Sequence, residues 1–211
     1  LKRDDYPFTN YTIKTTKTRK RAISIESIAS IENLELLATH PLFHTRNYFL
    51  FSFYMRGMPF ADLAHLTKEN IINGRIVFQR QKTDKPYNVK ITSEILSVYL
   101  TKESTYIFDI IKRSTLKEQY KDVEWSRKRY NKKLKDLATL CNIDEKLTSY
   151  VSRHSFATRA KNLGIPITTI SDMLGHESTK TTEIYMASLP DDIMDDAHEK
   201  IITLKTSKKS Q

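Results

Sequence analysis

Apolar residues recur at helical spacing along most of the chain. A stripe that begins behind Ser24 and runs to Leu34 predicts a first helix with a serine cap. Residues 41–54 are apolar on every side, which is typical of a buried central helix rather than a surface helix. Gly57 and Pro59 interrupt this pattern, and a short helix over 61–66 is expected after them.

One stretch in the middle of the chain favours strands. Asn73-Gly74 is the preferred dipeptide of a type I′ hairpin turn, and apolar residues lie on both sides of it, at 71–72 and 75–78. A second loop then leads into 87–91, which completes a small three-stranded antiparallel sheet. The remaining patterns predict helices over 92–100, 123–140, 148–163, 166–174, 178–187 and 191–204. The predicted fold class is therefore α+β, mostly α-helical, with one small sheet.

Three segments follow from this pattern. Residues 1–21 have no apolar periodicity and carry a basic run, so they are interpreted as a linker or arm. The chain begins without methionine, which suggests a domain upstream. Residues 22–205 form the predicted folded domain, and 206–211 form a basic tail.

Charge and cysteine content narrow the class of partner. The 211 residues include 35 Lys and Arg against 25 Asp and Glu, a net charge of +10. This excess favours a polyanionic partner, either nucleic acid or an anionic membrane surface.

The single cysteine excludes an internal disulfide and a multi-thiolate zinc site, and reducing cytosol is the expected setting. The longest apolar run, 48–55, is far shorter than the roughly 20 residues that span a bilayer.

The most informative motifs lie near the C-terminal end. Arg153-His154 falls in a predicted helix, Leu174-Gly175-His176 follows, and Tyr185 comes nine residues after that histidine (185 − 176). This ordered set resembles the catalytic domain of the tyrosine recombinases, the phage-integrase family. The resemblance covers about residues 22–205, and the segment 55–60 is similar to integrases of bacterial conjugative and transposable elements.

The resemblance implies a role for each of these side chains. Tyr185 would attack a DNA phosphate, Arg153 would hold two phosphate oxygens with its planar fork, and His176 would donate to the phosphate or assist the tyrosine. His154 is expected to be structural rather than a participant. The family usually has a histidine three residues before this arginine, and here that position is Tyr150, which can donate a hydrogen bond but is a poor proton shuttle.

A lysine on the second turn of the sheet is the implied general acid, because it would protonate the departing 5′ oxygen. Lys82 is the expected residue, with Lys85 as its rival and Arg80 as a weaker alternative. A lysine suits this role only if burial or neighbouring arginines lower its pKa.

The first arginine of the family pattern is missing from its usual place, which is occupied by Pro59. Arg56 lies three positions earlier, about 60° away around an ideal helix, and is the expected replacement. Arg46 and Arg80 are the less favoured alternatives for this first arginine. Asp62 is expected to orient an arginine rather than to act on the phosphate.

A basic run in the predicted helix 123–140 is the expected DNA-binding surface, although such runs are often only solvated helix faces. The predicted phosphate contacts are Arg127, Lys128, Arg129, Lys132, Lys133 and Lys135, together with Arg80.

The resemblance implies a site-specific DNA recombinase that integrates and excises a mobile element through a 3′-phosphotyrosyl intermediate, without metal or cofactor. Its expected partners are double-stranded DNA, further copies of itself in a tetrameric synapse and, as an option, accessory DNA-bending proteins. Residues 191–204 either pack on their own domain or are exchanged between protomers. The expected location is the bacterial cytoplasm, on the nucleoid and not at a membrane.

Three alternative functions stay open: a type IB topoisomerase-like enzyme, a non-catalytic accessory DNA-binding protein and a membrane-surface binder. For the last of these, Trp125 is a solitary aromatic feature.

Overall fold

A computed structural model of the chain describes the backbone of residues 21–80, 86–91, 96–100, 104–185, 193–195 and 198, and the side chains of these residues except 184 and 185. The helices in this part are α1 (Ile25–Glu32), α2 (Phe43–Tyr54), α3 (Phe60–His65), the 3-10 turn η2 (Lys68–Asn70), α4 (Ser97–Leu100), α5 (Leu116–Leu140), α6 (Val151–Asn162), α7 (Ile167–Leu174) and α8 (Thr179–Tyr185). The strands are β1 (Ile71–Ile72), β2 (Arg75–Gln79) and β3 (Pro86–Lys90). The predicted fold class, mostly helical with one small antiparallel sheet, is confirmed.

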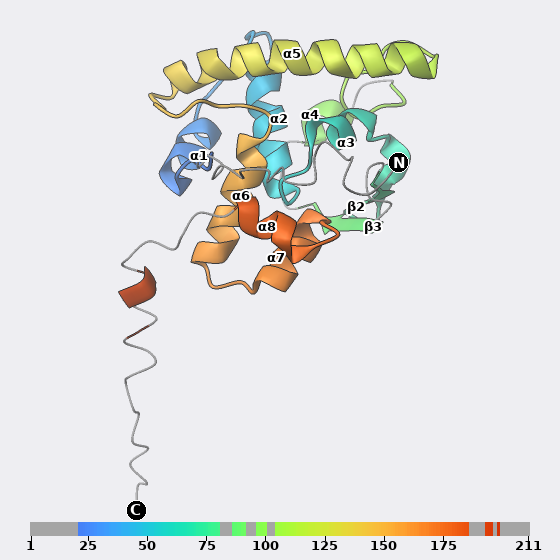
Figure 1. Ribbon diagram of the computed structural model, residues 1–211. Coiled ribbons are helices and arrows are strands. Elements are labelled where there is room, and N and C mark those ends of the chain that lie inside the picture. The colour runs from blue at the N-terminus through green and yellow to red at the C-terminus, as the bar shows by residue number, and fades with distance from the viewer. Residues whose placement is uncertain are drawn as a thin grey trace, which may run out of the picture.

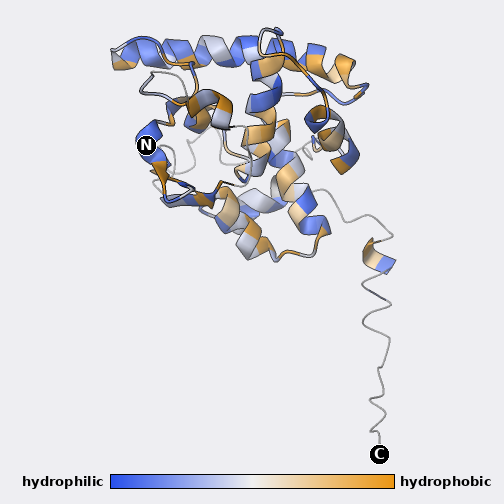
Figure 2. Cartoon of the chain, turned by 180° about the vertical axis from the view of Figure 1, so that it is seen from behind, coloured by the Kyte–Doolittle hydropathy of each residue, from blue (hydrophilic) through white to orange (hydrophobic). Residues whose placement is uncertain are grey.

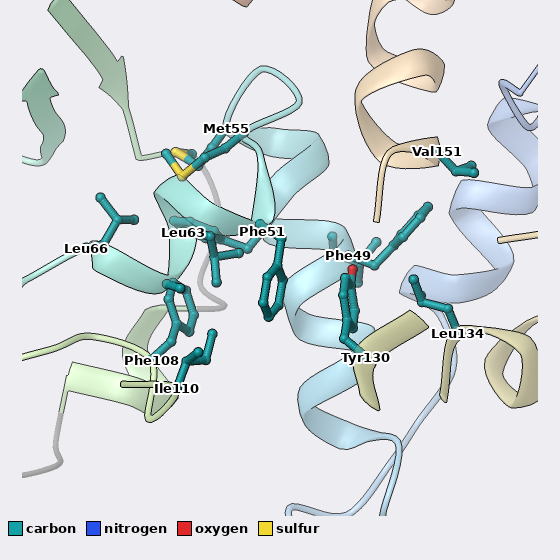
Figure 3. Close-up of a cluster of buried hydrophobic side chains, with 14 of the residues drawn as sticks. Phe49, Phe51, Met55, Leu63, Leu66, Phe108, Ile110, Tyr130, Leu134 and Val151 are labelled. Atoms are coloured by element: carbon teal, nitrogen blue, oxygen red, sulfur yellow. The ribbon is translucent and has the colours of Figure 1, made fainter. Parts of the chain in front are cut away.

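Helix α2 is the central helix of the fold. It packs against α1, α3, α5 and α6, and α5 lies across one end of it (Figure 1). Phe49 and Phe51 are fully buried, in a cluster that Tyr130 of α5 and Val151 of α6 complete (Figure 3). The prediction of a buried central helix is confirmed. The helix begins at Phe43 rather than at residue 41, because 41–42 form a turn.

The sheet is three-stranded and antiparallel, as predicted, and it has the predicted turn. Strand β2 lies between β1 and β3, and Ile76 pairs with Ile71 on one side and with Val89 on the other. Asn73 and Gly74 both have positive φ angles, 49° and 71°, as a type I′ turn requires. Because Ile76 and Val89 are buried, one face of the sheet joins the core.

Helix α5 begins at Leu116, two turns before the predicted start at residue 123. Leu116 is 85% exposed, so the first turns have no apolar stripe in contact with the core that could have revealed them. Polar contacts hold them instead. The carboxylate of Asp122 accepts hydrogen bonds from the backbone N–H groups of Lys112 and Arg113, and it forms an ion pair with the Arg113 guanidinium at 2.8 Å.

Helices α6, α7 and α8 lie at the end of α2 away from α5 (Figure 1). Helix α6 starts at Val151, three residues later than predicted, and ends before Gly164, whose φ is 74°. Pro166 caps α7 rather than forming its first residue, and Gly175 ends α7 in the left-handed conformation. A small apolar cluster holds α7 against α6; its buried members are Ala157, Ala160, Ile170 and Leu174.

Several predictions fall on residues outside this description. The arm 1–20, the start of the helix predicted from residue 92, the tail 206–211 and nearly all of the C-terminal helix 191–204 lie there. Among the helices that are described, none is both long enough and apolar enough to cross a membrane.

Candidate active site

Arg153 lies in the first turn of α6 and is 4% exposed. Its Nη1 donates to the carbonyl oxygen of Gly57 at 2.9 Å. Its Nη2 donates to the carbonyl oxygen of Leu174 at 2.5 Å and lies 2.9 Å from Nε2 of His176. The structure therefore brings together Arg153 and His176, two of the predicted site residues.

Gly57 makes this placement of Arg153 sterically possible. It has a φ of 67°, and a Cβ added to it would lie 2.6 Å from the Cα of Arg153, far inside van der Waals contact. Glycine is the residue that adopts this φ without strain and leaves room for a neighbouring backbone. The loop after α2 thus lies directly against the first turn of α6.

The surroundings of His176 fix its tautomer. The guanidinium of Arg153 can only donate, so Nε2 of His176 is the acceptor of that contact. The proton of the neutral imidazole is then on Nδ1, which lies 2.8 Å from Oγ1 of Thr182 in α8 and donates to it. This hydrogen bond joins α8 to the residue that follows the end of α7, and Thr182 is fully buried there.

Tyr185 is the last residue of α8, and its side chain lies outside the description. Its backbone is nevertheless placed next to the arginine–histidine pair. Tyr185 lies three positions after Thr182 in the same helix, and α8 packs against both α6 and α7. Lys82 lies outside the described residues altogether, as does its rival Lys85.

Arg80 is placed differently from a surface DNA contact. It follows β2 and is only 5% exposed. Its Nε forms an ion pair with Asp62 at 3.1 Å, and its Nη1 donates to the carbonyl oxygens of Leu174 at 2.7 Å and Gly175 at 3.0 Å. Asp62 therefore does orient an arginine, as expected, and that arginine is Arg80.

Arg56, the expected replacement for the missing arginine, lies in the same region. It is half-buried and has a φ of 53°, in the turn after α2. Burial raises the pKa of the Tyr87 hydroxyl, and the positive charges of Arg153, Arg56 and Arg80 oppose this rise. Arg56 is thus close enough to share this electrostatic environment. Arg46, the other alternative, lies near the start of α2 and donates to the carbonyl oxygen of Leu34.

Tyr150 and His154 occupy opposite kinds of position. Tyr150 precedes α6 and is 45% exposed, whereas His154, one turn later, is buried. Their ring centroids are 6.4 Å apart. The burial of His154 agrees with a structural role, and the Tyr150 side chain is open to solvent.

A buried serine pair supports the site and was not predicted from the sequence. Oγ of Ser52 in α2 donates to the carbonyl oxygen of Met58 at 2.7 Å and lies 2.7 Å from Oγ of Ser152 in α6. Ser152 immediately precedes Arg153, and Met58 immediately follows Gly57. The pair therefore fixes α2, the glycine loop and α6 relative to one another. A single serine in each of two helices gives no sequence signal for such a pair.

The six basic residues predicted on α5 are all exposed, but they do not share one face. At 100° per residue, four of them point away from the buried stripe of the helix: Lys128, Arg129, Lys132 and Lys135. Lys133 lies on the flank of the stripe, and Arg127 lies beside it. Lys128 forms an ion pair with Glu124 at 2.7 Å, and Lys133 donates to the Pro41 carbonyl oxygen at 2.8 Å. Figure 2 shows the hydrophilic character of this helix. A duplex could meet only part of the run at once.

No group of three or more His, Cys, Asp or Glu side chains able to hold a metal ion occurs within the described residues. What the site offers is a buried cluster of guanidinium donors, an imidazole with an assigned tautomer and a tyrosine on the adjacent helix.

Comparisons with known proteins agree with this geometry. The sequence model described as "Phage integrase family" matches residues 25–191. The chain is 28% identical over 176 residues to tyrosine recombinase XerD of Halalkalibacterium halodurans, covering 82% of this chain and 58% of the relative. It is 33% identical over 142 residues to XerD of Staphylococcus aureus, covering 63% of this chain and 46% of the relative. The chain thus spans about half the length of these curated relatives.

Solved structures show the same fold. XerA recombinase matches with a TM-score of 0.64 at 20% identity, over 90% of this chain and 67% of that one. XerH site-specific recombinase, in a post-cleavage complex with its palindromic difH substrate, matches with a TM-score of 0.64 at 20% identity, over 90% and 56%. The Tn1549 transposon integrase in complex with circular intermediate DNA matches with a TM-score of 0.55 at 13% identity, over 93% and 72%.

Proposed function

Because the chain belongs to the phage integrase family, we propose that it catalyses site-specific DNA strand exchange through a 3′-phosphotyrosyl intermediate. The observation that carries this proposal is the buried contact of Arg153 with His176, joined through Thr182 to the helix that ends at Tyr185.

In the proposed reaction the Tyr185 oxygen attacks the scissile phosphorus, and the bond from phosphorus to the 5′ oxygen breaks. The phenol loses its proton and the 5′ oxygen gains one, so the phosphodiester count is unchanged and no nucleotide cofactor is consumed. An ordinary phenol has a pKa of about 10, so only about 0.1% is ionised at pH 7 and proton removal needs help from the site. Lys82 is the proposed donor to the 5′ oxygen.

Arg153 and His176 would stabilise the charge that builds on the non-bridging oxygens in the transition state. Donors in a buried site are worth more there than in water, because they are already oriented and little solvent screens them. Arg153 and His176 are hydrogen-bonded to each other. Phosphate binding would replace that contact: Arg153 would donate to the phosphate oxygens, and His176 would donate through Nε2 once that nitrogen has taken up a proton.

The biological role proposed is integration and excision of a mobile element in the bacterial cytoplasm. Strand exchange would take place in a tetrameric synapse, with residues 191–204 exchanged between protomers and DNA-bending proteins as optional partners. The likeness to the Tn1549 transposon integrase and to recombinases in DNA complexes supports this role.

Covalent capture from a DNA pool tests the proposal, because the protein itself selects its target from the pool. Nicked duplexes with a randomised central region would be incubated with the protein, so that the short cleaved strand diffuses away and traps the adduct. Denaturing gels should show a slow-migrating protein–DNA species for wild type and none for Tyr185→Phe. An adduct that persists in Tyr185→Phe would contradict the proposed nucleophile. Tight binding without any adduct would favour an accessory DNA-binding protein, and relaxation of supercoiled DNA without sequence preference would favour a topoisomerase.

A further inference from the structure

Two arginines from different elements converge on one carbonyl oxygen. Nη1 of Arg80 and Nη2 of Arg153 donate to the oxygen of Leu174, at 2.7 Å and 2.5 Å. Arg153 comes from α6 and Arg80 follows β2, which are far apart in sequence. Their guanidinium groups therefore lie side by side at the C-terminal end of α7, next to His176.

This arrangement places two buried positive charges close together. Arg80 and Arg153 are 5% and 4% exposed, and Asp62 forms an ion pair with Arg80. Partial negative charge at the end of α7 offsets part of the repulsion between the two guanidiniums, but carbonyl dipoles do not supply a whole charge. Two guanidinium groups held side by side can both donate to the oxygens of one phosphate, so such a pair is suited to binding an anion.

The position of Arg80 is closely defined. Gly175 has a φ of 64°, and a Cβ added there would lie 2.7 Å from Nη1 and 3.0 Å from Cδ of Arg80. The hydrogen bonds of Arg80 with other described residues use Nε and Nη1. Of the five N–H donors of a guanidinium, the two on Nη2 are not used by these contacts.

We propose that Arg80 is the second phosphate-binding arginine of this enzyme, positioned by Asp62, and that its Nη2 donates to a non-bridging oxygen of the scissile phosphate beside Arg153. This inference rests on the proposed function. It identifies which side chain replaces the arginine that Pro59 displaces, and it places that arginine after a strand instead of in the turn after α2. Arg80 forms and breaks no covalent bond; it stabilises charge while Tyr185 and the 5′ oxygen exchange places on phosphorus.

Arg56 is the competing residue, and the structure favours Arg80 over it. Arg80 shares an acceptor with Arg153 and has a carboxylate partner. Arg56 is half-buried, and no hydrogen bond connects it to Leu174 or Asp62 in the described part of the chain.

The test compares adduct formation on a duplex recovered by covalent capture. Arg80→Gln is the main variant, Arg56→Gln is the rival, and Arg75→Gln is the control because it removes the same charge from the opposite end of β2. Arg80→Gln should slow adduct formation about 100- to 1000-fold, the range for loss of one transition-state donor, while DNA binding changes less than about tenfold. Arg75→Gln should match wild type.

A second substrate separates charge stabilisation from a structural role. In it, a methyl group replaces one non-bridging oxygen of the scissile phosphate, which removes the negative charge. On this neutral linkage, Arg80→Gln should cleave within about tenfold of wild type, because little charge remains for the arginine to stabilise. If Arg80→Gln does not fold, Arg80→Lys takes its place, since lysine keeps the charge but loses the planar fork. Arg80→Lys should be slowed on the natural phosphate and should cleave the neutral linkage within about tenfold of wild type.

The outcomes distinguish the two proposals. An unchanged rate in Arg80→Gln, or an equal defect on both substrates, would overturn the role of Arg80. A defect and rescue in Arg56→Gln with a normal Arg80→Gln would assign that role to Arg56. An adduct that persists in Tyr185→Phe would contradict the proposed function itself, whatever the arginine variants do.

Discussion

Replacing Gly57 by alanine should destabilise the domain clearly more than the same replacement at Gly74. Both glycines have left-handed backbones, with φ of 67° and 71°. A non-glycine residue pays about 1–2 kcal/mol in this conformation, and alanine recovers about 0.4–1 kcal/mol by restricting the unfolded chain. These contributions are common to both positions, so Gly74→Ala should cost roughly 0–1.5 kcal/mol.

The two sites differ in what the new Cβ would meet. At Gly74 nothing lies within 4 Å, whereas at Gly57 the Cα of Arg153 would be 2.6 Å away. Ordinary contact begins at 3.4 Å, so the loop or α6 must shift by about 0.8 Å (3.4 − 2.6). Such overpacking typically costs about 1–3 kcal/mol, which is the expected difference in unfolding free energy between the two variants.

Urea unfolding followed by far-ultraviolet circular dichroism would measure this difference, with the slope checked for unchanged two-state behaviour. Gly74→Ala is the matched control, because it has the same backbone cost without the collision. A Gly57→Ala variant as stable as Gly74→Ala would show that the loop does not lie against Arg153 as described.

Three further predictions concern the contacts around the site. Ser52→Ala should lower the unfolding free energy by about 1–3 kcal/mol in urea titrations, because it leaves a buried carbonyl oxygen unpaired; a loss below about 0.5 kcal/mol would contradict the serine bridge. Thr182→Val should slow adduct formation while DNA binding persists, because Nδ1 of His176 loses its acceptor; an unchanged rate would refute this. The hydrogen bond from Arg113 holds the pKa of Asp122 below its ordinary value of 3.8, so the contact stabilises the folded state above that value and the contribution is lost as pH falls through the lowered pKa. Acid unfolding of Asp122→Asn should therefore depend less steeply on pH below 5 than that of wild type, and parallel curves would exclude the effect.

Local sequence patterns predicted the elements that contact the core. The uniformly apolar stretch gave α2, and the Asn73-Gly74 dipeptide gave the hairpin, because both signals act through burial or through backbone conformation. The start of α5 was predicted too late, since Leu116 is exposed and the first turns are held by Asp122 through polar contacts. Apolar periodicity carries no information about such contacts.

The site was predictable where spacing carries the information and not where tertiary contact does. The spacing of Arg153, His176 and Tyr185 identified the family. Arg80 contacts the carbonyl oxygen of Leu174, 94 residues further along the chain, because strand β2 brings it to the end of α7. The local sequence around Arg80 or Leu174 does not encode this contact. Asp62 was predicted to orient an arginine, but the sequence did not indicate that this arginine is Arg80.

Mapping the site of DNA attachment would identify the nucleophile. The captured adduct would be digested with trypsin and nuclease, and the peptide carrying residual nucleotides would be sequenced by tandem mass spectrometry. We expect attachment through the oxygen of Tyr185, in the peptide that follows Lys180. Attachment at Tyr150 or at any other residue would contradict it.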